Sequence, residues 1–281
     1  MNKDHYPMYP KGRLIIIGDS TPDTYLEGEQ EPDINQIPAQ LFNLLPEHKN
    51  IRIEMIISDS KPGYKEKYSA ALQKHGYINL GIIHVHQENN FNDYYARISQ
   101  AEIIFIANED PEICEILKKS DILKLLHKKY IHEEDFTIIG MNAASMYVPR
   151  LLVNEKGIHQ GFGFINNCII DTKFECGTRF KKLIRAIMLH PECLGIGLNN
   201  GMLLVIEKGY KASCYGSSTV MTVDARHINK NKAGKGTTVF MKNLRGHILT
   251  EGSGINLCTG DLIKDNQFHN SLNFTRRNTI Q

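Results

Sequence analysis

Short apolar runs alternate with segments of helical composition through the first half of the chain. The apolar runs are rich in Ile, Leu and Val, which favour buried strands; they cover residues 14–17, 51–57, 78–86, 103–106 and 136–139. The intervening helical segments cover residues 37–45, 64–75, 92–100, 111–119 and 121–130. This order predicts an α/β fold with a mostly parallel sheet and helices on both faces.

The second half of the chain has a more β-rich pattern after one predicted helix at residues 179–189. Residues 194–198 and 202–206 are predicted to pair as a hairpin, because the intervening Asn-Gly is a strong turn signal. Further strands are predicted at residues 220–224, 237–240, 244–249 and 255–257. We expect residues 1–281 to form one domain with a β-rich C-terminal part, and residues 264–281 to form a polar tail.

Residues 135–152 contain the most informative local pattern. An apolar run ends at Gly140, and small, helix-favouring residues begin at Ala143. A strand, a tight turn and a helix in this order predict a nucleophile elbow, which presents one side chain at the carboxyl edge of a parallel sheet. The residue at the tip is Asn142. A carboxamide cannot be activated by a neighbouring base as a hydroxyl or a thiol can.

Charge and composition exclude several classes of function. The net charge of +2 gives no electrostatic footprint for nucleic acid or for an anionic membrane. We see neither an apolar run long enough to span a bilayer nor a secretory signal, and we expect a cytoplasmic protein. The six cysteines lack C-x-x-C spacing, so we interpret them as reduced thiols.

Six phrases of the sequence, taken in order, resemble one known family. Residues 139–146 resemble "GTSAGA", and residues 161–183 resemble "GLGL…DQHF…R.R..RL". The other four phrases lie at residues 11–18, 105–112, 191–205 and 244–257. Together they resemble the cyanophycinases, which are serine-type peptidases related to dipeptidase E, over about residues 11–263.

The resemblance implies a flavodoxin-like fold of the class I glutamine amidotransferase type, usually as a homodimer. Members of the family hydrolyse a β-linked aspartyl-arginine polymer to dipeptides. They use a Ser nucleophile, a His base and an acidic partner, because the base removes the hydroxyl proton and the acid orients the base. The resemblance implies no cofactor and no metal.

The three catalytic positions of the family are all substituted in this chain. The nucleophile position is Asn142, the base position is Lys173 and the acid position is Asn200. The resemblance implies a ligand-binding set that is formed by Asp110, Asp171, Arg179 and Lys182. We therefore expect a homologue without peptidase activity that binds a small peptide, such as an aspartyl-arginine type, or acts as a regulatory partner.

Alternative interpretations remain open from the sequence. A rebuilt hydrolase site could use Ser145 or Cys176, but a helix-surface or helix-packing serine and a structural thiol are the simpler explanations of these residues. His84, His86 and Glu88 have a strand spacing that could place metal ligands on one face. The Lys- and Arg-rich segment at 226–235 is interpreted as a solvated loop.

Overall fold

The computed structural model describes residues 9–18, 37–57, 63–84, 92–108, 110–172, 174, 177–227 and 244–263. Several predictions fall outside these described residues. They concern the strand at 237–240 and the residues Lys173, Cys176, His86 and Glu88.

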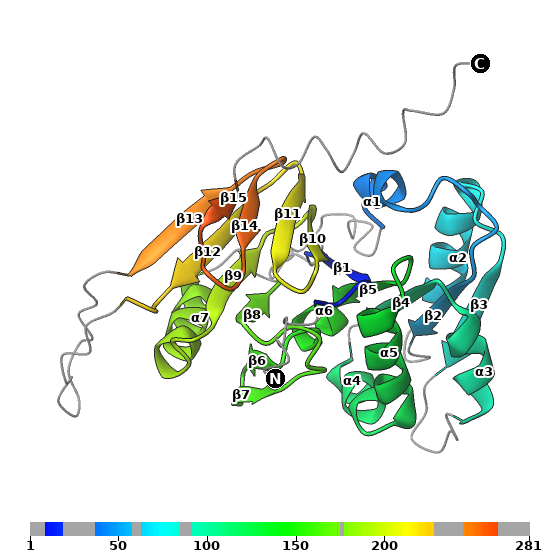
Figure 1. The fold of residues 1–281 in the computed structure, drawn as a ribbon, viewed down its shortest axis with the longest axis horizontal. Helices are drawn as coiled ribbons and strands as arrows, with labels where there is room; N and C mark the ends of the chain where they lie inside the picture. The colour runs from blue at the N-terminus through cyan, green and yellow to red at the C-terminus, as the bar shows by residue number, and fades with distance from the viewer. Residues whose placement is uncertain are drawn as a thin grey trace, which may run out of the picture.

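A large sheet forms the centre of the described structure and confirms the predicted α/β class (Figure 1). Five neighbouring strands run parallel, in the order β3 (Leu80–His84), β2 (Ile53–Ile57), β4 (Ile103–Asn108), β5 (Thr137–Asn142) and β1 (Arg13–Ile17). Four antiparallel strands extend it beyond β1, in the order β10 (Met202–Glu207), β11 (Lys211–Gly216), β14 (Gly254–Asn256) and β15 (Leu262–Ile263). The parallel half and the β-rich C-terminal part are both as predicted.

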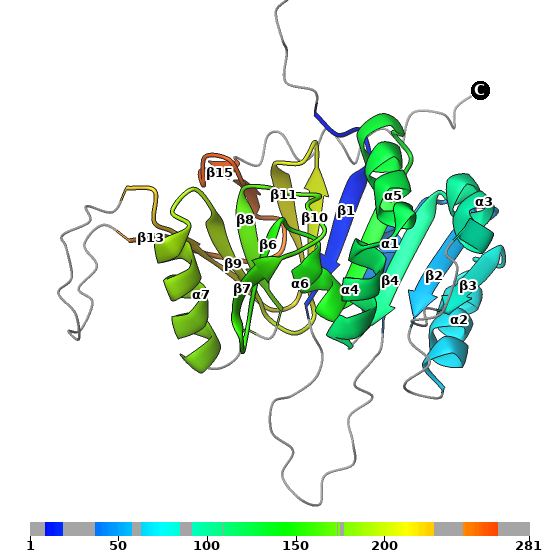
Figure 2. The same cartoon turned by 90° about the horizontal axis from the view of Figure 1, so that it is seen from below.

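Helices cover both faces of the parallel strands, as Figure 2 shows from below. On one face, α1 (Ala39–Leu44) and α2 (Tyr64–Lys74) bury Leu41 and Tyr68 against Met55 of β2. On the other face lie α3 (Asn92–Gln100), α4 (Pro111–Lys118) and α5 (Asp121–His132). Asp110 caps α4 by accepting a hydrogen bond from the amide of Glu112 (2.8 Å). This cap and Pro111 at the first helical position explain where α4 begins.

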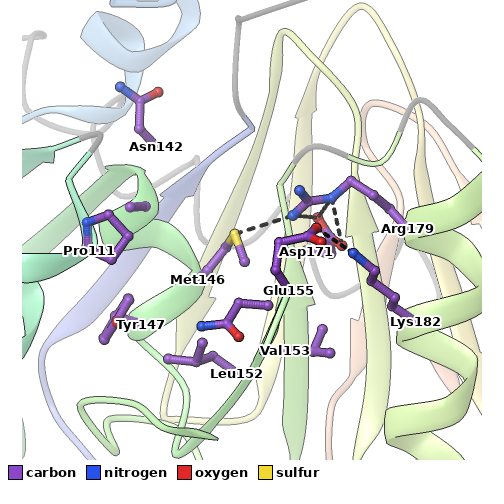
Figure 3. Close-up of a pocket in the computed structure, with 12 residues that line it drawn as sticks. Pro111, Asn142, Met146, Tyr147, Leu152, Val153, Glu155, Asp171, Arg179 and Lys182 are labelled. Carbon is purple, nitrogen blue, oxygen red and sulfur yellow. Dashed lines mark hydrogen bonds and ion pairs between the residues drawn. The ribbon is translucent and has the colours of Figure 1, made fainter. Parts of the chain in front are cut away.

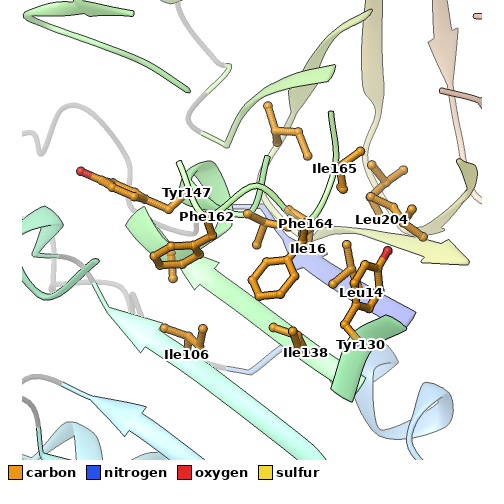
Figure 4. Close-up of a cluster of buried hydrophobic side chains, with 14 of the residues drawn as sticks. Leu14, Ile16, Ile106, Tyr130, Ile138, Tyr147, Phe162, Phe164, Ile165 and Leu204 are labelled. Atoms are coloured by element: carbon orange, nitrogen blue, oxygen red, sulfur yellow. The ribbon is translucent and has the colours of Figure 1, made fainter. Parts of the chain in front are cut away.

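The core on this second face is closed by a loop from the second half of the chain. Phe162 and Phe164 lie over Leu14 and Ile16 of β1, with Ile138 of β5 beside them (Figure 4). His127 of α5 holds this loop through its Nε2, which lies 2.8 Å from the carbonyl oxygen of Phe162. Burying a large apolar side chain contributes about 1.5–3 kcal/mol, so the loop adds substantially to the stability of the parallel half.

A second, four-stranded sheet carries the helix α7 (Gly177–Leu189). Its strands, in order, are β13 (Arg245–Leu249), β12 (Val220–Asp224), β9 (Leu194–Leu198) and β8 (Cys168–Asp171). Leu183 and Ile187 of α7 pack onto this sheet. A Cβ at Gly195 would lie 2.8 Å from Ile187 Cγ1, so the glycine permits the close approach of helix and strand.

The predicted pairing of residues 194–198 with 202–206 is wrong. Both segments are strands, but β9 pairs with β8 and β12, whereas β10 pairs with β1 and β11. The Asn-Gly turn is present, with Gly201 at φ 76°, yet it carries the chain from one sheet to the other. Every residue of β9 is buried, so its register follows the cores of the two sheets rather than the turn.

Two further features were not predicted. A two-stranded sheet is formed by β6 (Leu151–Asn154) and β7 (Gly157–Gln160). The helix after the elbow, α6 (Ala143–Tyr147), has only five residues. Within the described residues, no helix is both long enough and apolar enough to cross a bilayer.

Candidate functional site

The turn between β5 and α6 has the strained geometry of an elbow. Asn142 ends β5 with φ 59° and ψ −129°. Side chains other than glycine rarely adopt a positive φ, and this region costs of order 1–3 kcal/mol. Among the described residues, Lys208 is the only other non-glycine residue with a positive φ. The backbone therefore places Asn142 at the tip of a sharp strand-to-helix turn, and Asn142 is one of the residues that line a cavity.

Close packing behind the tip explains why the turn is held. A Cβ at Gly140 would lie 3.2 Å from the backbone nitrogen of Ser145, so glycine lets α6 approach β5. The hydroxyl of Ser145 lies 2.6 Å from the carbonyl oxygen of Gly140 and 2.9 Å from that of Ile17. Ser145 thereby connects α6 to both central strands, and it is fully buried.

A cavity of about 270 Å³ opens beside this turn (Figure 3). Its apolar lining comes from Pro111, Ala143, Met146, Tyr147, Leu152 and Val153. Its polar lining comes from Asn142, Asn154, Glu155, Asp171, Arg179 and Lys182. In Figure 3, Asn142 lies at the end near α4 and α6, whereas Asp171, Arg179 and Lys182 lie at the end near α7. The cavity thus combines an apolar wall with one charged end.

Two ion pairs form the charged end. Arg179 of α7 contacts both carboxylate oxygens of Asp171 of β8, with Nε at 2.9 and 3.1 Å. Its Nη2 lies 2.8 Å from Asp171 Oδ1, and the carboxylate side chain is only 2% exposed. Nearer the solvent, Lys182 pairs with Glu155, whose side chain is 83% exposed. The hydrogen bond from Lys182 lowers the pKa of Glu155, so this carboxylate is ionised at neutral pH.

Tyr147 is held as a neutral phenol beside the cavity. Burial raises its pKa above the usual value, and its hydroxyl donates to Glu115 Oε1 at 3.0 Å. Burial acts to raise the pKa of Glu115 as well, but hydrogen bonds from Lys118 and Tyr147 outweigh it and lower that pKa. Lys118 Nζ also reaches the carbonyl oxygen of Gln160 at 3.0 Å. These contacts fix α4 against α6 and the β6–β7 hairpin.

The structure brings together only some of the residues singled out from the sequence. Asn142, Asp171, Arg179 and Lys182 all line the cavity. Asp110 is not among the described residues that line the cavity, although its neighbour Pro111 is. The carboxylate of Asp110 caps α4 instead.

The turn that carries Asn200 lies near the elbow without entering the cavity. A Cβ at Gly18, which follows β1, would collide with the carbonyl oxygen of Asn199, so the turn packs against that end of β1. β1 and β5 are parallel neighbours, and their carboxyl ends share one edge of the sheet. The side chain of Asn200 is exposed and is not among the described residues that line the cavity.

The alternative nucleophile Ser145 is not placed for catalysis. Its side chain is buried, its hydroxyl contacts two backbone carbonyl oxygens, and it does not line the cavity. Cys176 lies outside the described residues. Of the described residues that line the cavity, none is Ser, Thr, Cys or His. Within the described part of the chain, no group of three metal-ligating side chains comes together.

The sequence reasoning missed the wall supplied by the β6–β7 hairpin. Leu152, Val153, Asn154 and Glu155 line the cavity from this hairpin. The signal was present, because an apolar run is followed by Asn-Glu-Lys-Gly and Gly157 has φ 121°. Met146 and Tyr147 were also missed, although they directly follow the elbow.

Comparison with known proteins finds that the sequence is similar to one enzyme group. A cyanophycinase from Geminocystis herdmanii is 23% identical over 208 residues, which cover 68% of this chain and 76% of the relative. The chain resembles cyanophycinases. A second cyanophycinase, from Trichormus variabilis, is 24% identical over 169 residues, covering 55% of this chain and 56% of the relative. The chain thus spans little more than half the length of this second cyanophycinase.

No family model matches the chain. A solved structure from Listeria monocytogenes, assigned to peptidase E, aligns with a TM-score of 0.49 at 11% identity and covers 74% of this chain and 99% of that one.

Proposed function

We propose that this chain is a cyanophycinase-like protein that has lost peptidase chemistry and binds a small aspartyl-arginine-type peptide in the cavity beside α6. The observation that carries the proposal is Asn142 at the strained strand-to-helix turn that borders the cavity. A carboxamide cannot serve as an activated nucleophile. In triad enzymes, loss of the nucleophile alone costs on the order of a millionfold in turnover.

The charged end of the cavity fits a zwitterionic peptide. Glu155 and Lys182 present a carboxylate and an ammonium group at the exposed rim. An exposed ion pair contributes only about 0–1 kcal/mol, so a ligand can replace it at little cost. The guanidinium of an aspartyl-arginine ligand would then pair with Glu155, and a ligand carboxylate with Lys182. The more buried Asp171–Arg179 pair would keep its place and shape the end of the cavity.

Binding is tested by isothermal titration calorimetry with β-Asp-Arg dipeptide. We expect saturable binding, and about tenfold weaker binding in each of Lys182→Ala and Glu155→Ala, because each loses one charged contact. The matched controls are Lys124→Ala and Asp121→Ala, which remove an exposed ion pair on α5. Absence of saturable binding, or equal weakening in the controls, contradicts the proposed ligand site.

A further inference from the structure

Among the described residues, β13 is an edge strand of the four-stranded sheet. It pairs with β12 on one side, and no described strand pairs with its other side. Figure 1 shows β13 on the outside of this sheet, away from the parallel strands. Unpaired edge strands present backbone donors and acceptors to other chains, and natural proteins usually blunt them with charge, bulges or covering elements.

The backbone groups of two residues point to this open edge. His247 directs its amide toward β12, where Thr222 Oγ1 accepts at 3.1 Å. Because backbone groups alternate sides along an antiparallel strand, the N–H and C=O groups of Gly246 and Ile248 face the other way. Ile248 is also 69% exposed, which is unusual for a large aliphatic side chain on a strand.

An apolar groove of about 180 Å³ accompanies the edge on the face that carries α7. It is lined by Phe180 of α7, Met221 and Val223 of β12, and Leu244 and Ile248. Phe180 packs edge-on against Phe174 at 5.8 Å, which holds its ring in place. The groove can therefore take an apolar side chain from a strand added beside β13.

Three cations on β13 and α7 have no carboxylate partner in the described part of the chain. Arg245 of β13 is exposed, and Lys181 and Arg185 are exposed on α7; none of the three forms an ion pair with a described residue. The strand period of two places Arg245 on the opposite face from Ile248. A complementary strand would thus carry apolar side chains toward α7 and acidic side chains toward Arg245.

We propose that β13 is a docking edge for an extended protein segment in which acidic and apolar residues alternate, and that this segment adds to the sheet as a further strand. Main-chain hydrogen bonds to Gly246 and Ile248 supply affinity, as in other β-augmentation complexes. The groove beside Phe180 and the charge of Arg245 supply selectivity. This site is separate from the cavity beside α6 and does not depend on the function proposed for that cavity.

The test uses an equimolar pool of fluorescein-labelled heptapeptides in which Asp or Glu alternates with Val, Ile, Leu or Phe. We expect a saturable rise in fluorescence anisotropy with the full-length protein. Arg245→Glu should weaken binding by about tenfold or more through charge repulsion. The matched control Lys128→Glu reverses an exposed charge on α5 and should leave binding unchanged.

Strand addition is separated from non-specific attraction by peptides of the same sequences with N-methyl groups on alternate amides. These peptides keep their charge and side chains but cannot complete the ladder, so we expect their binding to be lost. Equal binding of the methylated peptides overturns the proposal. So does stronger binding of single-stranded DNA of equal charge, or a wild-type chain that forms dimers which Arg245→Glu disperses.

Discussion

At the scale of single residues, Asn142 supports the proposal that the cavity lacks peptidase chemistry. Its backbone geometry is the strained one that an elbow requires, and its side chain has no group that a base could activate. Gly140 and Ser145 support this turn by close packing and by hydrogen bonds to backbone carbonyl oxygens. The strain is therefore maintained by its surroundings although no nucleophile stands at the tip.

The strain at this turn predicts opposite effects for two neighbouring glycine substitutions. Asn142→Gly should raise the free energy of unfolding by about 1 kcal/mol, because relief of a strained φ exceeds the added entropy of the unfolded chain. Ala143→Gly, inside the helix that follows, should lower it by about 0.5–1 kcal/mol. Urea denaturation of both variants measures the difference. Destabilisation by both variants would show that the Asn142 side chain contributes more than the strain costs.

The sequence was sufficient to predict the elbow because a β-branched run, Gly140 and a series of small residues lie next to one another. It could not predict that Ser145 is fully buried, because that depends on the distant carbonyl oxygen of Ile17. It also did not predict that the carboxylate of Asp110 caps α4, and the ligand-binding role expected for Asp110 stays a prediction. The sequence predicted features that depend on neighbouring residues, and it did not predict those that depend on contacts between distant parts of the chain.

At the scale of elements, α7 separates two surfaces. Arg179 and Lys182 face the cavity, whereas Phe180 lies in the groove beside β12 and β13. These directions follow from the turn of about 100° per residue in a helix. The ion pair between Arg179 and Asp171 fixes α7 to β8, and Lys182 connects α7 to the β6–β7 hairpin.

The buried pair predicts a non-additive response to substitution. Arg179→Met should lower the free energy of unfolding by about 3–5 kcal/mol, because it leaves the Asp171 carboxylate buried without its main cation. The double variant Asp171→Asn with Arg179→Met should regain most of this loss, since no buried charge remains. A double-mutant cycle by urea denaturation measures the coupling. Simple additivity of the two single changes would contradict the role given to the pair.

Pairing between elements was the least predictable feature. The strands β9 and β10 were both predicted, but their partners were not, because a turn signal does not say which sheet receives each strand. The hairpin that does form, between β10 and β11, turns at Lys208 and Gly209, both with positive φ. A lysine in that position carries no strong turn signal.

At the scale of the whole molecule, a small polar cluster joins the two larger sheets. Asp224 at the end of β12 binds Arg226, and Arg226 donates to the carbonyl oxygen of Cys258 in the loop after β14. A Cβ at Gly260 would collide with Arg226 Nη2, so glycine permits this contact. The cluster therefore connects the four-stranded sheet to the antiparallel end of the nine-stranded sheet.

This cluster predicts a loss of stability in acid. Burial acts to raise the pKa of Asp224, but hydrogen bonds from Arg226 outweigh it and lower that pKa. A depressed folded-state pKa stabilises the fold above the unfolded value of about 4, and this contribution disappears as the pH falls through the lowered value. The stability advantage of wild type over Asp224→Asn should therefore shrink below about pH 4, as urea titrations at several pH values would measure. If the stability advantage of wild type over Asp224→Asn grows in acid, the lowered pKa of Asp224 is contradicted.

The matched background for that comparison is Arg226→Met. In this background the shrinkage in acid should become smaller or change sign, because burial then acts to raise the pKa of Asp224 without the guanidinium hydrogen bonds that oppose it.

At the same scale, the homodimer and the cytoplasmic location expected from the sequence stay predictions.

The measurement that tests the central claim most directly is hydrolysis of cyanophycin by the purified wild-type protein, with released β-Asp-Arg dipeptide detected by mass spectrometry. We predict release no faster than in a protein-free blank, because a carboxamide stands at the tip of the elbow. Dipeptide release by wild type that Asn142→Ala abolishes would contradict the account, because the residue assigned as inert would then be required for turnover.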